Sequence, residues 1–209
     1  MSHDHITKEP VTKEAATKEA ATDQAVPELI GQQTDRHASG ILVTLVDGDD
    51  RVIGAADKLV AHRAPGLLHR AFSVVLVNTA EEFILQRRAA LKYHFPLRWS
   101  NACCGHPGPA IDTLAAAGKR LTEELGVTCT LHSVGSFTYR AEDPVSGLVE
   151  HEIDHVFLGR HDGPFHPDPS EVAEVRVMRL SKLCEDLELH PDAYTPWLRQ
   201  VINRVVALR

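Results

Sequence analysis

Lys119-Arg120-Leu121-Thr122-Glu123-Glu124-Leu125-Gly126 is the stretch of this sequence that decides its fold. It is typical of the end of a helix, because a glycine follows the last apolar position and stops the helical pattern. Asp112 precedes this apolar-periodic segment and is a suitable N-cap for the same helix. The helix therefore presents two adjacent carboxylates, Glu123 and Glu124, next to its glycine stop.

A second informative stretch lies upstream, Trp99-Ser100-Asn101-Ala102-Cys103-Cys104-Gly105-His106-Pro107. It places a thiol, a flexible glycine and an imidazole at three consecutive positions. A thiol can act as a nucleophile or an acid, and an imidazole can bind a metal. Together with the carboxylates at the helix end, these groups predict an enzyme. The flanking residues that can lock the loop are Trp99, Asn101, Cys103 and Pro107.

The composition limits the class of protein. The 209 residues, 43% of them apolar, suffice for one domain with a buried core. The net charge of −7 is not offset by a basic region, so we expect no nucleic-acid partner. No apolar run approaches the roughly 20 residues of a membrane span, and the N-terminus has no signal-peptide pattern. The four cysteines show neither metal-knuckle spacing nor a disulfide framework, which favours reduced thiols and a cytoplasmic location.

The N-terminal part of the chain contains a five-residue repeat, at residues 7–11, 12–16 and 17–21. Its composition favours helix, but it has no apolar face that tertiary packing can stabilise. We interpret residues 1–38 as a low-complexity, mobile tail, with a tether or partner helix as the alternative. Residues 39–209 are the expected folded domain.

Within the folded part, strand and helix patterns interleave without a regular βαβ repeat. The expected strands are residues 41–46, 51–54, 71–77, 83–86, 127–140, 148–158 and 175–178. The expected helices are residues 112–125, a short helix capped by Ser181, and a terminal helix opened by Thr195-Pro196-Trp197. The pattern predicts one mixed α/β (α+β) domain after the tail.

The end of the first helix resembles the second half of a Nudix box. Lys119, Glu123 and Glu124 occupy positions of that motif, in which helix carboxylates hold a divalent ion against a diphosphate. A solvated helix end with ordinary charges is the alternative interpretation. The first half of the box differs, because Ile111 and Arg120 stand where the motif has glutamates. The sequence therefore favours a Nudix-like scaffold without the hydrolysis.

The resemblance becomes more specific over residues 42–197. The chain is similar to type 1 isopentenyl-diphosphate Δ-isomerases, a Nudix-fold family, in five motifs that keep their order and spacing. They are Lys58-Leu59-Val60-Ala61-His62, Leu67-Leu68-His69-Arg70-Ala71-Phe72-Ser73, Leu85-Gln86-Arg87-Arg88-Ala89, Asn101-Ala102-Cys103-Cys104-Gly105-His106-Pro107, and Tyr139-Arg140-Ala141 with Gly147-Leu148-Val149-Glu150-His151-Glu152. The resemblance implies a mixed β-sheet sandwiched by helices.

The same resemblance implies a metal site with five protein ligands. Glu150 and Glu152 are two residues apart, so on a strand they face the same side. Three imidazoles and two carboxylates suit an octahedral ion such as Mn²⁺ or Mg²⁺. His151 and His155 lie on the same strand but do not match the pattern. The implied ligands are His62, His69, His106, Glu150 and Glu152.

The resemblance also implies the groups that carry the reaction. Cys104 and Glu152 form the implied acid–base pair, and Cys103 does not match the reactive position. Tyr139 and Trp197 match aromatic positions around the isoprenoid tail, where an aromatic face stabilises a nearby cation. Core packing is an equal alternative for Trp197. The order in which the two carriers move protons stays open.

The implied diphosphate site consists of cations and a second metal position. Arg88, Lys92 and Arg120 match basic contacts of the family, and Lys58 belongs to the first motif. Glu124 matches a ligand of a second Mg²⁺ that arrives with the substrate.

The expected function is isomerisation of isopentenyl diphosphate to dimethylallyl diphosphate, a step in isoprenoid precursor synthesis. The alternatives are a Nudix pyrophosphohydrolase of a nucleotide or other diphosphate, and a non-catalytic protein that binds a metal or prenyl diphosphate. The expected partner is a small prenyl diphosphate, and the expected assembly is a monomer or weak homodimer.

Overall fold

The sheet is built around one apolar strand, β3 (His69–Val77), in the computed structural model, which describes Met1 and residues 40–207. All but one residue of this strand are buried, as expected for a strand in the middle of a sheet with both faces covered. β8 (Val149–Arg160) pairs in parallel with β3 along the whole length of β3. The predicted tail, residues 1–38, lies outside the described residues apart from Met1.

Three shorter strands share the other edge of β3. β1 (Leu42–Val46) pairs at the His69 end, β6 (Cys103–Gly105) in the middle, and β4 (Phe83–Arg88) at the Val77 end, all antiparallel. The sheet is extended by β2 (Val52–Asp57), β5 (Trp99–Ser100), β7 (Leu131–Glu142) and β9 (Val172–Met178). One parallel pair among antiparallel ones makes a mixed sheet, which confirms the predicted class.

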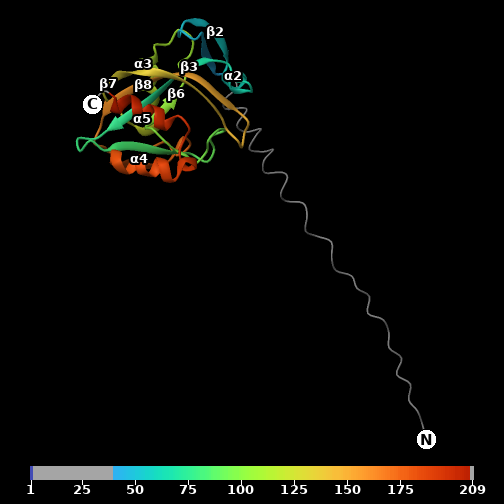
Figure 1. The fold of residues 1–209 in the computed structure, drawn as a ribbon, viewed down its shortest axis with the longest axis vertical. Helices are drawn as coiled ribbons and strands as arrows, with labels where there is room; N and C mark the ends of the chain where they lie inside the picture. The colour runs from blue at the N-terminus through green and yellow to red at the C-terminus, as the bar shows by residue number, and fades with distance from the viewer. Residues whose placement is uncertain (2–39, 208–209) are drawn as a thin grey trace.

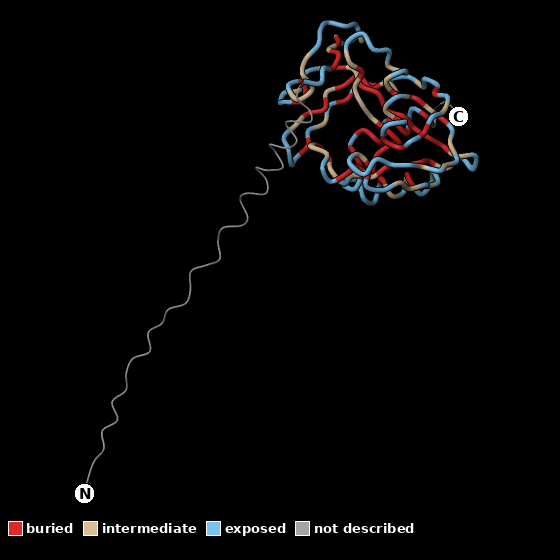
Figure 2. Tube along the Cα trace, turned by 180° about the vertical axis from the view of Figure 1, so that it is seen from behind, coloured by how far each residue is buried: buried red, intermediate tan, exposed pale blue. Residues whose placement is uncertain are grey.

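Helices cover both faces of this sheet (Figure 1). Phe72, Val74 and Leu76 of β3 pack in one apolar cluster with α3 (Thr113–Leu125), whereas Val75 and Val77 pack in the other. That second cluster includes buried residues of α4 (Leu180–Leu189) and α5 (Leu198–Val206). Because successive side chains of a strand point to opposite faces of the sheet, β3 contributes to two core layers. Figure 2 shows the buried segments gathered inside.

The expected helix ends are found where capping chemistry predicts them. The Asp112 carboxylate accepts a hydrogen bond from the backbone N–H of Ala115 at 2.8 Å, and α3 ends at Gly126 with φ of 66°. On α5, Leu198, Val201, Ile202 and Val205 form the predicted buried stripe. Both helices confirm the sequence pattern.

Two local predictions are corrected, and two short helices are added. Ser181 does not cap α4, because Arg179 is the N-cap in extended conformation and Ser181 already lies in the first turn. The strand expected from residue 127 begins at Leu131. Two short helices were not predicted, α2 (Lys58–His62) and the 3₁₀ turn η1 (Pro191–Ala193), since each is too short to show an apolar period.

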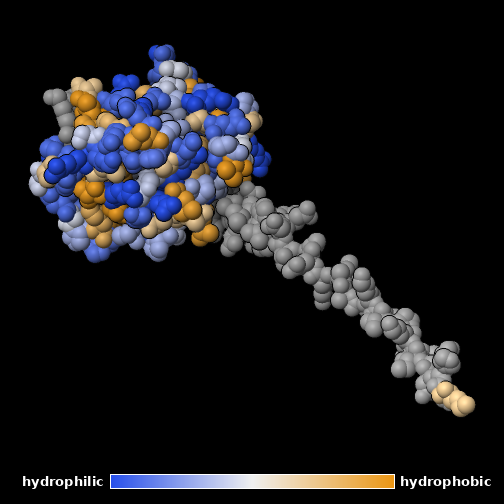
Figure 3. Space-filling view, turned by 60° about the horizontal axis from the view of Figure 1, so that its bottom comes forward, coloured by the Kyte–Doolittle hydropathy of each residue, from blue (hydrophilic) through white to orange (hydrophobic). Residues whose placement is uncertain are grey.

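None of the helices in residues 40–207 combines the length and apolarity that a bilayer span needs. On the face shown in Figure 3, apolar side chains are scattered among hydrophilic ones.

Replacing Gly126 by alanine is expected to destabilise the fold. Its φ lies in the left-handed region, and an added Cβ would come within 2.8 Å of the Cβ of His166. We expect the free energy of unfolding in urea to fall by about 1–3 kcal/mol. The matched control is Gly118→Ala in the same helix, where an added Cβ meets nothing within 4 Å. That variant should gain roughly 0.5–1 kcal/mol. Equal stability of Gly126→Ala and the unmodified protein would contradict the argument.

Candidate active site

The five predicted metal ligands converge at one end of the sheet. His62 ends α2, His69 begins β3, and His106 follows β6 directly. The parallel register places His69 opposite Glu152, and Glu150 lies two residues earlier on the same face of β8. Their ligand atoms all lie within 4.8 Å of one another. The fold therefore brings together the whole predicted set.

The ring orientations of two histidines suit metal binding. The Nδ1 atoms of His62 and His69 lie 2.7 Å from the carbonyl oxygens of Lys58 and Leu67. A carbonyl only accepts, so each Nδ1–H donates there, and Nε2 is the ring nitrogen turned toward the other ligands. The Nε2 of His69 has no hydrogen-bond partner among the described residues. A buried imidazole nitrogen without a hydrogen bond, facing the Glu152 carboxylate at 3.5 Å, fits a cation ligand.

The carboxylates complete this donor set. Glu150 Oε2 lies 2.9 Å from Nε2 of His62, and Glu152 Oε1 lies 2.6 Å from Nε2 of His106. Both carboxylates are nearly fully buried. Three nitrogen and two oxygen donors packed this closely without solvent fit a divalent ion.

The two carboxylates differ in their electrostatic surroundings. Burial raises the pKa of Glu150, but the imidazoles of His94 and His62 outweigh it and hold that pKa well below its usual range. Burial and the negative charge of Glu150 raise the pKa of Glu152 to about 7. Neighbouring carboxylates with opposite shifts can take different roles, one as a permanent anion and one as a proton carrier.

Strand alternation separates the two adjacent thiols. Cys104 lies opposite Ser73 on β3, on the face that carries His69, and its Sγ is 3.6 Å from the Ser73 hydroxyl. Cys103 packs in the apolar cluster of α3, on the other face. Burial, followed by the nearby carboxyl of Asp154, raises the pKa of Cys104 to about 12. The thiol that shares a face with Glu152 is therefore Cys104.

The two predicted aromatic residues lie beside this pair. The hydroxyl of Tyr139 donates to Glu152 Oε2 at 2.6 Å, and the Tyr139 ring lies 6.0 Å from the ring of Trp197. Both rings are buried, and both belong to the core cluster under α5. Trp197 therefore packs in the core and also lies next to Tyr139, the residue that contacts Glu152.

A second charged cluster surrounds the end of α3. Glu124 is buried and accepts from Arg120 Nη2 at 2.8 Å and from Gln86 Nε2 at 2.9 Å, with Lys92 Nζ at 3.5 Å. Glu171 pairs with both Lys92 and Arg120, the latter at 2.8 Å. The predicted cations Lys92 and Arg120 therefore converge on Glu124.

The other two predicted cations have different surroundings. The guanidinium of Arg88 is buried and donates to the carbonyls of Phe95 at 3.0 Å and His94 at 2.9 Å, so it holds the loop before the cysteines. The ammonium of Lys58 lies 5.3 Å from the centroid of the Tyr93 ring, and burial lowers its pKa.

Sequence reasoning missed two residues of the site. His94 contacts Glu150 Oε1 through its Nε2, and its ring centroid is 5.7 Å from that of His62. Burial lowers the pKa of His94 to about 3. Glu171, in the turn directly before β9, joins the cation cluster. Neither residue belongs to one of the five motifs. The one sequence feature that pointed toward His94 is the high number of histidines, 13 in the chain.

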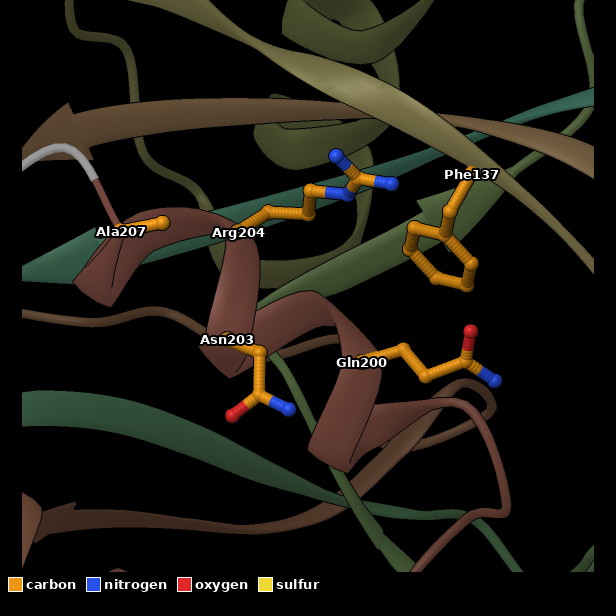
Figure 4. Close-up of a pocket in the computed structure, with 5 residues that line it drawn as sticks. All are labelled: Phe137, Gln200, Asn203, Arg204 and Ala207. Carbon is orange, nitrogen blue, oxygen red and sulfur yellow. The ribbon is translucent and has the colours of Figure 1, made fainter.

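Two surface pockets of residues 40–207, one on α5 and one on β7, lie away from the predicted site residues. One of about 290 Å³ opens on α5, where Gln200 and Arg204 point toward Phe137 of β7 (Figure 4). None of the predicted site residues lines it. The candidate site is instead the buried cluster at the His69 end of β3.

The chain is similar to known proteins over most of its folded part. The NUDIX domain model matches residues 67–202. The chain is 53% identical over 161 residues to an isopentenyl-diphosphate Delta-isomerase of Nocardia farcinica, covering 77% of this chain and 92% of the relative. It is 46% identical over 167 residues to isopentenyl-diphosphate Delta-isomerase 1 of Aromatoleum aromaticum, covering 80% and 93%.

Solved structures support the fold alone. A Deinococcus radiodurans structure matches with a TM-score of 0.64 at 18% identity, covering 78% of this chain and 98% of that one. The matched domain and the identity to the curated relatives confirm the resemblance that the motifs indicated. The chain belongs to the NUDIX domain family and, within it, to the isopentenyl-diphosphate Δ-isomerases.

Proposed function

We propose that this protein converts isopentenyl diphosphate to dimethylallyl diphosphate. The observation that carries the proposal is the placement of Cys104 and Glu152 on one buried face, next to five converging metal-ligand side chains. The names of the curated relatives support the same reaction. The substrate gains a proton at its terminal alkene carbon and loses one from its C2 methylene, which moves the double bond.

Two proton carriers suit this chemistry. An alkene is a weak base, so protonation creates a tertiary carbocation, which water must not reach. Cys104 and Glu152 come from different strands; Glu152 is buried and Cys104 is partly buried. Two carriers largely withdrawn from solvent can give and remove protons while the bound substrate excludes water. The Tyr139 hydroxyl orients Glu152 through its hydrogen bond to Oε2.

Aromatic side chains stabilise the cationic stage. The rings of Tyr139 and Trp197 lie beside the carriers, and their π-faces attract positive charge. Such a contact is worth about 0.5–2 kcal/mol. These rings also fill space that water would otherwise occupy.

The metal belongs with the ligand set already described: His62, His69, His106, Glu150 and Glu152. Its mixed nitrogen and oxygen donors favour Mn²⁺ or Mg²⁺ in octahedral geometry. When bound, the ion supplies positive charge that fixes the two carboxylates. Glu124 is the proposed ligand of a second Mg²⁺ that arrives with the diphosphate.

The diphosphate is bound by the cations around Glu124. Arg120 offers a planar fork for phosphate oxygens and Lys92 a point charge. Arg88 and Lys58 are proposed as further contacts, with Arg88 also holding the loop. A pyrophosphohydrolase is not favoured, because Ile111 is exposed and Arg120 pairs with Glu124 and Glu171 rather than adding a carboxylate. A cytoplasmic location and a monomeric or weakly dimeric state complete the proposal.

Removing either proton carrier should abolish turnover. We expect Cys104→Ala and Glu152→Gln each to lower kcat by at least about 10³-fold, because each removes one of the two proposed proton carriers. Conversion of isopentenyl diphosphate followed by NMR measures this directly. Cys103→Ala, whose thiol lies on the opposite face, should retain kcat within about threefold. Full activity in both carrier variants would exclude the assignment.

Metal binding should depend on His69 but not on His155. Both histidines are on paired strands, but His155 lies outside the cluster and contacts Asp50 at 2.8 Å. Titration calorimetry with Mn²⁺ should show at least about a 100-fold loss of affinity in His69→Gln. His155→Gln should bind like the unmodified protein. Unchanged Mn²⁺ affinity in His69→Gln argues against the five-ligand site.

The stability contributed by Glu171 should depend on pH. Its burial raises the pKa, but Lys92 and Arg120 outweigh this and lower it to about 2 from the usual 4.5. A depressed pKa stabilises the fold above about pH 4.5, and this stabilisation is lost as pH falls toward 2. With partial exposure taken into account, Glu171→Gln should cost about 1 kcal/mol near pH 7.

Urea unfolding of both proteins at a series of pH values, with chelator present, measures this difference. The gap between them should shrink below about pH 4.5. Glu123→Gln is the matched control, since its carboxylate is half exposed and contacts Arg120 only at 3.5 Å. A gap for Glu171→Gln that stays constant with pH would overturn the prediction.

A further inference from the structure

The side chain of Asn101 is fixed in one orientation. It is 1% exposed and lies between β5 and β6. Its Nδ2 donates to the carbonyl oxygens of Val74 at 3.1 Å and Cys103 at 2.7 Å. Carbonyl oxygens only accept, so the NH₂ end of the amide must face them. The amide oxygen Oδ1 therefore points the other way and acts only as an acceptor.

Three donors meet that single oxygen. Cys104 Sγ lies 3.2 Å from Oδ1, Trp197 Nε1 also 3.2 Å, and Ser100 Oγ 3.1 Å. The indole comes from the start of α5, 96 residues further along the chain. One buried oxygen thus joins the thiol strand to the helix that carries the aromatic face.

A second contact reinforces this junction. The hydroxyl of Ser100 lies 3.1 Å from that of Thr195, two residues before Trp197. Both hydroxyls are buried, and the backbone N–H of Thr195 donates to the Trp99 carbonyl at 2.9 Å. The start of α5 is therefore attached to the cysteine loop through the side chain of Asn101 and through its neighbours.

We propose that Asn101 is a positioning residue, whose amide oxygen holds Cys104 and Trp197 in a fixed relation on the face occupied by Glu152. This rests on the proposed function, in which Cys104 carries a proton and Trp197 faces the cationic carbon. The amide touches the thiol and the indole, and its own geometry is fixed by two backbone carbonyls. It acts through the other two residues.

The requirement for such a residue follows from the reaction. Proton transfer to carbon depends on distance and direction, and a misplacement of about 1 Å can cost roughly 100-fold in rate. Among residues 40–207, the side chain of Asn101 makes no hydrogen bond to Lys92, Arg120 or Glu124, the residues proposed to bind the diphosphate. Loss of the amide should therefore affect kcat and leave KM largely unchanged.

The test is Asn101→Ala in a Trp99→Phe background, which leaves Trp197 as the single indole because the sequence has two tryptophans. We expect kcat for isopentenyl diphosphate to fall about 10- to 100-fold with KM within about threefold. The fluorescence of Trp197 should shift to longer wavelength and become easier to quench with acrylamide. Asn78→Ala, which removes a half-buried amide bonded to Glu82, is the control and should change neither signal.

A double-mutant cycle separates positioning from general destabilisation. Trp197→Phe keeps a smaller aromatic ring and removes the N–H donor to Asn101. If one oxygen links the two residues, the double variant Asn101→Ala/Trp197→Phe should lose much less than the product of the single losses. Multiplicative losses, or an unchanged kcat in Asn101→Ala, overturn the proposal.

Two further outcomes are decided by the same measurements. If Asn101→Ala does not fold, Trp197→Phe alone must lower kcat several-fold with KM unchanged, and a kcat equal to the unmodified enzyme refutes the link. If the unmodified protein shows no turnover, the proposed function fails. The indole signal of Asn101→Ala then still tests the positioning, because an unshifted emission rejects it without reference to activity.

Discussion

The parallel pairing of β3 with β8 is the constraint on which the site depends. Because His69 stands opposite Glu152, the histidine and both carboxylates of β8 face the same side of the sheet. The antiparallel pairing of β6 with the other edge of β3 adds Cys104 to that side. A slip of one residue in either register would turn these side chains toward α3. The apolar, doubly buried sequence of β3 holds both registers.

The site residues whose positions depend on strand alternation or on helix capping could be predicted from the sequence. Glu150 and Glu152 are spaced by two, and the Asp112 and Gly126 signals located the helix that carries Glu124. The parts contributed by loops could not. His94 reaches Glu150 from a loop in which Phe95 and Leu97 adopt left-handed conformations, with φ of 46° and 58°. Non-glycine residues seldom adopt such conformations, and no local sequence pattern indicates them.

The site is also a region that the rest of the fold must stabilise. Buried polar atoms such as Nε2 of His69, Nδ1 of His106 and Oδ1 of Asp154 have no hydrogen-bond partner among residues 40–207. Leaving such groups unpaired costs free energy, at roughly 1–3 kcal/mol each. Apolar clusters on both faces of the sheet offset this cost. The core on both faces thus fixes the strands from which the ligand side chains project.

Three carboxyl groups at alternate positions of β8 show how local partners assign roles on one strand. The imidazoles of His94 and His62 keep the pKa of Glu150 low, whereas Asp154, which accepts from the Ser73 hydroxyl at 2.7 Å, has its pKa raised far above normal by burial and then by Glu152. Glu152 lies between them with a pKa near 7. A general acid–base group works best when its pKa is close to the working pH. Of the three, Glu152 has the pKa closest to neutrality, and it also accepts the hydrogen bond of the Tyr139 hydroxyl.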